Sequence, residues 1–202
     1  AGFSSSTRGF AAGGYDPNKD VIDFVTIQST GNATDFGDMS SARLGNRGAQ
    51  SPTRGLIFGG KDSETRNYIE YVTMSTTGNT ADFGDLTQDS YQGTAGSNAI
   101  RALAGAGTYN NSDANNTMSY VTIATLGNAL DFGDLIQNHI ECGQGACSPT
   151  RIVIPGSFTS NNNPSNRMEY AQIMTTGNFI DYGDLTTSNN GTSGGSNGHG
   201  GL

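Results

Sequence analysis

The stretch Thr30-Gly31-Asn32-Ala33-Thr34-Asp35-Phe36-Gly37-Asp38 organises the chain, because it returns three more times with few changes. Each copy of this nine-residue phrase reads Gly-Asn, two variable residues, then Asp-Phe/Tyr-Gly-Asp; the further copies are Thr77–Asp85, Leu126–Asp134 and Thr176–Asp184. Self-similarity at a fixed period is the signature of a repeat architecture. The phrase therefore predicts a structural array rather than a single catalytic motif.

The repeat has a period of 46 to 50 residues. An arginine opens each unit, and the units span about residues 8–53, 54–100, 101–150 and 151–199, starting at Arg8, Arg54, Arg101 and Arg151. A partial fifth unit covers residues 200–202, since Gly200 stands at the same offset from the preceding phrase as Arg54 does. We therefore predict a single repeat array over residues 1–202.

Each unit contains four segments with the pattern of short β-strands. The clearest is Tyr68–Met74, which alternates between two faces. It follows a short apolar segment that ends in glycine, Arg54–Gly60, and it precedes a strand that carries Asp-Phe/Tyr-Gly-Asp. The Gly-rich piece Ser41–Gln50 fits a strand packed closely against its neighbours. The predicted fold class is all-β, with about four short antiparallel strands per unit.

The residues of the nine-residue phrase have separate expected roles. Thr-Gly-Asn is predicted to make a tight hairpin turn, because Gly and Asn tolerate positive φ. The aromatic residue is predicted to pack between adjacent units, while the glycine and the flanking aspartates shape a bulge. The arginine that opens each unit either binds an anionic ligand or, the favoured interpretation, contacts aspartate or carbonyl groups of the next unit.

Composition narrows the classes of function. The chain has 30 glycines, no tryptophan and 33% hydrophobic residues, which is typical of a turn-rich β protein. A net charge of -8 argues against a nucleic-acid partner, whose phosphates need a basic surface. The sequence has no run of eighteen apolar residues and no basic and apolar leader pattern, so we expect neither a membrane span nor a signal peptide.

Cysteine and histidine residues break the repeat. Cys142 and Cys147 have no counterparts in the other units, so we expect unpaired small apolar residues rather than a disulfide framework. His139 and His199 lack partners at the spacing of zinc ligands, and we expect both at exposed or loop positions.

The period and strand count are those of propeller blades, whose kelch-type repeats run at about 50 residues. The chain resembles kelch repeats at three kinds of position: a diglycine, a first aromatic and a second aromatic. These are Gly13-Gly14 and Gly59-Gly60, then Phe24, Tyr71, Tyr120 and Tyr170, then Phe36, Phe83, Phe132 and Tyr182. It departs from kelch in lacking tryptophan and in loosening the diglycine to Gly105-Ala106-Gly107 and Pro155-Gly156. The resemblance implies a kelch-like propeller or an open run of blades, with a β-solenoid as the alternative.

The sequence Tyr-Val-Thr-Ile, followed by Thr-Gly-Asn-Ala-x-Asp-Phe-Gly-Asp-Leu, is similar to the tandem repeats of structural proteins from marine and cyanobacterial tailed phages. This resemblance covers nearly the whole chain and brings no active-site residues with it. It implies a component of a virion appendage, located in the virion or outside the cell, with other virion subunits as partners.

The nine-residue phrase invites two chemical interpretations. Asp-Phe-Gly alone does not indicate a protein kinase, because the Gly-rich loop, strand lysine and His-Arg-Asp loop are missing. Paired carboxylates can bind calcium, which is the one cofactor the pattern allows. The candidates are Asp35, Asp38, Asp82, Asp85, Asp131, Asp134, Asp181 and Asp184. Capping of nearby backbone amides by these aspartates is the favoured interpretation, and no metal site is assigned.

Variable loops are the expected place for ligand binding, since repeat arrays keep packing residues constant and vary their loops. The loops after the first strand of each unit diverge most and mix polar with aromatic residues, which suits sugars and also ordinary exposed turns. The candidate ligand-binding residues are Tyr15, Asn18, Lys61, Glu64, Tyr109, Asn110, Phe158 and Asn161.

The sequence thus predicts a non-catalytic structural and recognition module of a phage tail fibre or tail-associated protein. Its variable loops are expected to meet a host-surface glycan or a neighbouring virion protein. One alternative is a subunit of an extracellular filament, and a homo-oligomer is expected. The other is a glycan-cleaving enzyme, which needs a carboxylate pair; Glu64 and Glu141 are unpaired acids that break the repeat.

Overall fold

The computed structural model describes residues 1–110, 113–160, 163–189 and 191–195. All regular elements in this part of the chain are β-strands, and every strand pairing between them is antiparallel. The predicted all-β class is confirmed. Within the described residues there is no helix long and apolar enough to cross a membrane.

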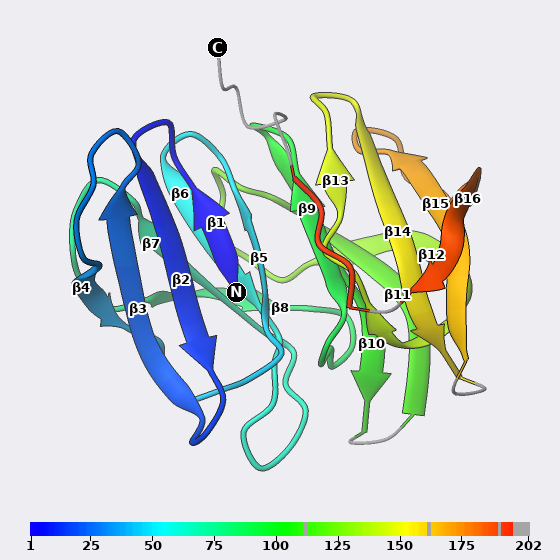
Figure 1. The fold of residues 1–202 in the computed structure, drawn as a ribbon, viewed down its shortest axis with the longest axis horizontal. Helices are drawn as coiled ribbons and strands as arrows, with labels where there is room; N and C mark the ends of the chain where they lie inside the picture. Colours follow the sequence, from blue (N-terminus) through cyan, green and yellow to red (C-terminus); the bar gives the residue numbers. More distant parts are fainter. Residues whose placement is uncertain (111–112, 161–162, 190, 196–202) are drawn as a thin grey trace.

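Two sheets have four strands each, in sequence order (Figure 1). The first contains β1 (Gly2–Ser4), β2 (Arg8–Gly14), β3 (Lys19–Thr26) and β4 (Thr34–Asp38). The second contains β5 (Arg47–Gln50), β6 (Arg54–Phe58), β7 (Tyr68–Thr73) and β8 (Ala81–Asp85).

The third sheet has eight strands. They are β9 (Thr94–Ser97), β10 (Arg101–Tyr109), β11 (Asp113–Thr122), β12 (Leu130–Cys142), β13 (Ala146–Cys147), β14 (Arg151–Thr159), β15 (Pro164–Gln172) and β16 (Ile180–Asn189). Strand β12 is long enough to pair with β11 near its start and with β14 through His139–Cys142 at its end. We refer to β1–β4, β5–β8, β9–β12 and β13–β16 as the first to fourth strand sets.

The strands lie close to the predicted segments. Strand β7 covers the predicted Tyr68–Met74 segment except for its last residue, and β6 covers most of Arg54–Gly60. The Gly-rich piece also forms a strand, β5, which pairs with β6 rather than with the strands before it. It packs as closely as expected, because a Cβ added at Gly48 would collide with the backbone of Gly2. Strand β5 therefore starts the second strand set.

The predicted tight hairpin at Thr-Gly-Asn is wrong. Residues 74–80 connect β7 to β8, and their turn is closed earlier, by the Thr76 amide and the Thr73 carbonyl at 3.1 Å. Gly78 has the expected positive φ of 153°, but the Gly-Asn segment leaves its own sheet and contacts the preceding strand set. Its role is to dock two sheets together.

The docking is the same at each of the three junctions between consecutive strand sets. At the first, the Gly78 and Thr80 amides donate to the Phe36 and Asp38 carbonyls at 2.8 and 2.9 Å, and Asn79 Oδ1 accepts the Asp38 amide at 3.1 Å. The equivalent donors and acceptors at the other two junctions are Gly127, Asn128 and Ala129 with Phe83 and Asp85, then Gly177, Asn178 and Phe179 with Phe132 and Asp134.

Two further hydrogen bonds complete each junction. The arginine that opens a unit donates to a carbonyl of the next set, in the pairs Arg8–Met74 (2.9 Å), Arg54–Ile123 (2.6 Å) and Arg101–Ile173 (3.1 Å). A side chain of the next set accepts an amide, in the pairs Glu70–Ser40 (3.1 Å), Ser119–Thr87 (3.4 Å) and Glu169–Ile136 (2.8 Å). The prediction that the arginine contacts carbonyls of the next unit is confirmed.

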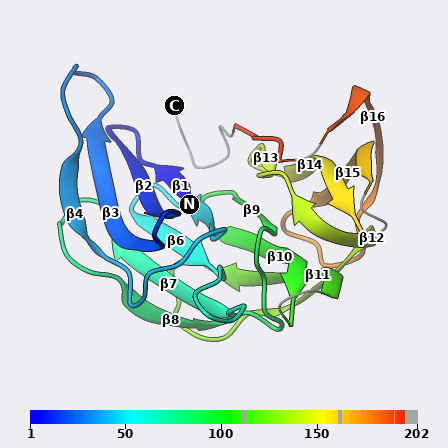
Figure 2. The same cartoon turned by 60° about the horizontal axis from the view of Figure 1, so that its bottom comes forward.

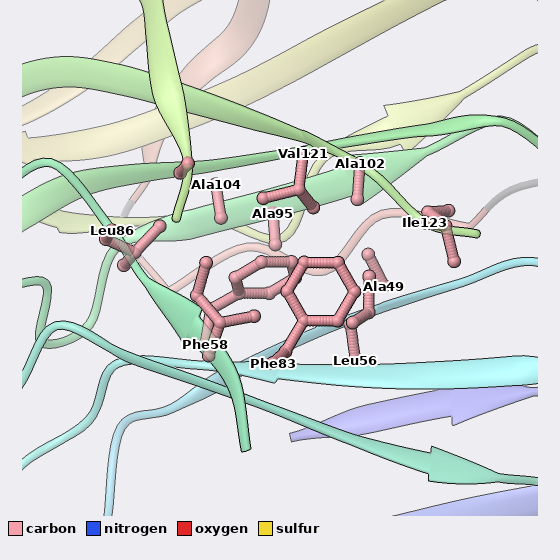
Figure 3. Packing of buried hydrophobic residues seen from close by; sticks show 12 residues of the cluster. Ala49, Leu56, Phe58, Phe83, Leu86, Ala95, Ala102, Ala104, Val121 and Ile123 are labelled. Carbon is pink, nitrogen blue, oxygen red and sulfur yellow. The ribbon is translucent and has the colours of Figure 1, made fainter. Parts of the chain in front are cut away.

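The core lies between the strand sets. Figure 3 shows the cluster at the second junction, where Leu56, Phe58 and Phe83 face Ala102 and Val121 of the next set. Phe36, Phe83 and Phe132 are each 2% exposed, which confirms packing of the phrase aromatic between sets. The residue before Gly37 is the extra residue of a bulge, since β3 pairs Ile22 with Gly37 but Asp23 with Asp35. The predicted bulge is therefore present.

The strand sets follow one another along an arc (Figure 2). The first set lies at one end and β15 and β16 lie at the other, with β9 and β10 between them. The short opening strands β1 and β5 contact each other, as do β5 and β9, so they line the inner side of the arc.

Candidate functional site

The variable loops gather at one end of the molecule. They connect β2 to β3, β6 to β7, β10 to β11 and β14 to β15, and the ends of β2, β10 and β14 that lead into them lie along the lower edge in Figure 1. The connections that carry the nine-residue phrase lie at the opposite end, because successive antiparallel strands reverse direction. The loops that diverge in sequence thus share one edge of the array.

The first two variable loops touch. Tyr15 follows β2 and is 77% exposed, so its ring is available to a partner. Asn18 Nδ2 donates to the Lys61 carbonyl at 3.4 Å, and Lys61 Nζ lies 5.7 Å from the centre of the Tyr91 ring. Three of the predicted ligand-binding residues, Tyr15, Asn18 and Lys61, therefore belong to two loops in contact.

The remaining predicted residues occupy varied positions. Glu64 lies in the second loop, with its carboxylate 3.5 Å from the Arg66 guanidinium. Tyr109 ends β10 and Asn110 follows it with a positive φ of 44°, as a turn residue. Phe158 lies within β14, opposite Glu141 and Pro164, so it is a half-buried strand residue rather than a loop residue. Asn161 lies outside the described residues.

Tyr91 lies beside Lys61 of the second variable loop, and the sequence reasoning missed it. It bridges to Thr108, and its ring packs where a Cβ at Gly45 would collide with it. Burial raises the pKa of the Tyr91 hydroxyl, and the charge of Glu141 adds to that effect. The signal was available, because an aromatic residue stands here at the repeat position of Leu44.

A cavity of about 670 Å³ lies on the inner side of the arc. The opening strands β1, β5 and β9 contribute to its wall, with residues of β13 and of the segment 191–195; among the lining residues are Gly48, Ser97, Glu141, Gln144 and Cys147. Of the described residues that line it, Glu141 alone carries a carboxylate. Glycosidases use two carboxylates that flank the scissile bond.

Polar side chains around this cavity bind the backbone of the opening strands. Arg47 Nε donates to the Gly93 carbonyl at 2.7 Å, and Arg47 Nη2 donates to the Cys142 carbonyl at 3.0 Å. Burial lowers the pKa of Arg47, and the nearby Cys142 and Glu141 oppose that effect. Gln144 Nε2 donates to Gly48 and Ala95 carbonyls at 2.8 and 2.7 Å. These two side chains hold the inner wall together.

Two buried acids have cationic or polar partners. Glu70 forms a buried ion pair with Arg43, and Glu169 lies 3.6 Å from His139. The expectation of an exposed or loop His139 is wrong: the residue lies in β12 and is 3% exposed, because β12 extends past the phrase. His199 lies outside the described residues.

Cys142 and Cys147 are free and buried, as expected for small apolar residues. Burial raises the pKa of each thiol to about 12. Each thiol therefore stays protonated at neutral pH, and neither resembles a reactive cysteine, which needs a lowered pKa.

One aspartate of the phrase, Asp35, binds a backbone amide through its side chain. Asp35 Oδ1 accepts the Gly37 amide at 3.1 Å, which is the favoured capping role. Within the described part of the chain, no group of three or more His, Cys, Asp or Glu side chains is placed to hold a metal ion. The calcium interpretation gains no support from this arrangement.

Comparison with known proteins gives a likeness of fold. No protein-family model matches the sequence, and no curated protein matches it significantly. Among solved structures, the fold is similar to that of YjhT, with a TM-score of 0.76 at 8% sequence identity. The alignment covers 93% of this chain and 66% of YjhT, so the chain spans just under two thirds of that protein. At this identity the likeness concerns the fold alone.

Proposed function

We propose that the chain is a non-catalytic recognition module of a phage virion appendage, and that its variable loops bind a host-surface glycan. The observation that carries the proposal is the contact between the first two variable loops, in which Asn18 of the loop that holds the exposed Tyr15 binds the Lys61 carbonyl of the second loop. Aromatic and hydrogen-bonding side chains together suit the apolar faces and hydroxyl groups of sugars. The resemblance of the repeat sequence to tandem repeats of tailed phages supports a location in the virion.

We further propose that the four strand sets are kelch-like propeller blades in an open arc. Support comes from the period of the repeat, from the four-strand meanders and from the identical junctions between them. The likeness to YjhT over most of the chain agrees with a shared arrangement. In this arrangement the junctions provide a rigid scaffold and the loop edge provides recognition.

Binding to a panel of bacterial surface glycans and to host cells tests the proposal. We expect Tyr15→Ala and Lys61→Ala to weaken glycan binding about tenfold or more, since exposed aromatic anchors carry much of an interface's free energy. Leu126→Ala is the matched control, because Leu126 is 58% exposed in a connection at the opposite end of the strands.

The outcomes separate recognition from scaffolding. If neither glycans nor host cells bind while the protein is present in purified virions, the receptor role fails and a contact with neighbouring virion proteins replaces it. If Leu126→Ala weakens binding as much as Tyr15→Ala, the loop edge is not the binding surface.

A further inference from the structure

We propose that pairs of side chains buried between the strand sets form a matching code, which keeps each set from docking onto the set after the next one. The backbone, asparagine and arginine contacts cannot make this selection, because they are the same at all three junctions. Docking in the wrong order is a characteristic failure of proteins built from similar repeats. Contacts that differ from one junction to the next can select the correct neighbour.

The first member of each pair lies where a strand set faces the next one. It is Arg43 in the first set, Ser90 in the second and His139 in the third. The structure makes the three positions equivalent, because their backbones pair with equivalent residues of their own sets, which are Lys19, Arg66 and Asn115. The three residues are only 0%, 6% and 3% exposed. Burial therefore removes the water that would otherwise solvate the charge of Arg43 or of a protonated His139.

The second member lies on the facing side of the next set, at the position of Glu70, Ser119 and Glu169. Glu70 forms the buried ion pair with Arg43 at the first junction. The Nε and Nη1 atoms of Arg43 have no hydrogen-bond partner among the described residues, so Glu70 is the acid that compensates its charge. At the third junction His139 Nε2 lies 3.6 Å from Glu169 Oε1. The first and third junctions thus each bury an acid beside a basic side chain.

The second junction holds neutral hydroxyl groups at both positions. Ser90 Oγ donates to the Ala106 carbonyl of the third set at 2.9 Å, and Ser119 Oγ lies 2.6 Å from the Thr87 hydroxyl of the second set. Each serine therefore has a partner across the junction and requires no charge opposite it. Charged and neutral pairs alternate along the three junctions.

This alternation makes the omission of one set unfavourable. If the first set docked onto the third, Arg43 would be buried opposite Ser119. If the second set docked onto the fourth, Glu169 would be buried opposite Ser90. Each error leaves a buried charge without its partner, which is strongly destabilising. In the correct order, each acid at these positions faces a basic side chain.

Disulfide trapping in the full chain tests the code. The Asp38 amide meets the Asn79 side chain in the correct order, so docking of the first set onto the third would bring Asp38 to the equivalent Asn128. The probe chain carries Asp38→Cys and Asn128→Cys, with Cys142→Ala and Cys147→Ala to remove the native thiols. It is refolded from urea at low concentration and then oxidised, and mass spectrometry measures the fraction of chains with an intramolecular disulfide. A second probe, Asp38→Cys/Asn79→Cys, reports the correct order.

Adding Arg43→Met/Glu70→Gln to the first probe removes the charged pair with neutral side chains of similar size. We expect the fraction with the disulfide between positions 38 and 128 to rise about fivefold or more, because docking onto Ser119 then buries no charge. The matched control is His139→Gln/Glu169→Gln, which neutralises the third junction and leaves Arg43 in place. It is expected to leave this disulfide fraction unchanged.

Circular dichroism and urea unfolding establish that the variants fold, and Arg43→Gln/Glu70→Gln replaces the first pair of changes if that variant does not. A disulfide fraction that stays the same after neutralisation of the first junction overturns the proposal. An equal rise in the His139→Gln/Glu169→Gln control also overturns it, because the effect would then be a general loosening of the junctions.

Discussion

Glu70, Ser119 and Glu169 occupy one repeat position and accept the same kind of hydrogen bond with different side chains. The two glutamates are buried, and a buried carboxylate needs a partner to offset its lost hydration. Arg43 and His139 lie beside them, whereas the neutral Ser119 needs no such partner. A single change at one repeat position therefore explains why a histidine is buried in β12.

The two buried thiols predict a pH dependence of stability. Below about pH 8.5 both are protonated in the folded and the unfolded chain. Above it the unfolded chain releases their protons, whereas burial keeps them bound in the folded chain until about pH 12. Stability is then lost as pH rises through this window, by up to about 1.4 kcal/mol per pH unit for each thiol.

Urea unfolding at a series of pH values measures this loss. The control is Cys142→Ala/Cys147→Ala, which keeps the other groups that titrate in the same range. We expect the unaltered chain to show the steeper decline. Equal slopes for the two proteins contradict a raised thiol pKa.

Strand sets are joined by the close approach of two glycines. Gly84 has a positive φ of 142°, and a Cβ there would lie 2.5 Å from the Gly127 carbonyl carbon. Gly183 has a similar φ of 127°, but no atom lies within 4 Å of its Cβ position. An alanine at either position would therefore have the same unfavourable backbone conformation, but only at Gly84 would it also collide with a neighbouring strand set.

This difference gives a matched pair of substitutions. We expect Gly84→Ala to destabilise the chain by about 1–3 kcal/mol more than Gly183→Ala, because overpacking a junction forces backbone shifts. Urea unfolding measures the loss of unfolding free energy in both variants. Equal losses would mean that strain, and not sheet docking, makes the glycine necessary.

The inner and outer strand sets of the array differ in the number of junctions that stabilise them. Among the residues that the structure describes, the second and third sets have junctions on both faces, whereas the first and fourth have one each. In repeat proteins, stability is approximately the sum of intrinsic and nearest-neighbour terms. The inner sets are therefore held more firmly against local opening.

Hydrogen exchange measures this difference in local stability between inner and outer strand sets. We expect amides of β6, β7 and β10 to exchange slowest, and those of β3 and β16 to exchange faster by tenfold or more, roughly 1.4 kcal/mol of local stability. Uniform protection along the chain is the contrary outcome, and it would indicate one cooperative unit.

Much of the fold could be predicted because its signals are local. The alternation in Tyr68–Thr73 and the repeated aromatic at Phe36 are readable within a few residues. The docking role of Gly78-Asn79 could not be read in the same way, since its partner lies about forty residues earlier and its sequence is also typical of hairpin turns.

The candidate site was predicted less completely than the fold. Tyr15, Asn18 and Lys61 were selected because loops vary, and their mutual proximity depends on how two strand sets dock. Tyr91 and the inner cavity depend on the arc, which no single unit encodes. The sequence predicts Phe158 as a loop residue, because nothing in the local sequence shows that β14 continues through it.

Strand β12 also makes the two halves of the molecule differ in how their strand sets are joined. Its pairing with β14 fuses the third and fourth sets into one hydrogen-bonded ladder, while the first and second sets remain separate sheets. Under a stretching force, we expect the docking contacts at the first two junctions to yield before the pairing of β12 with β14 does. We therefore expect the third and fourth sets to resist separation more strongly than the sets before them.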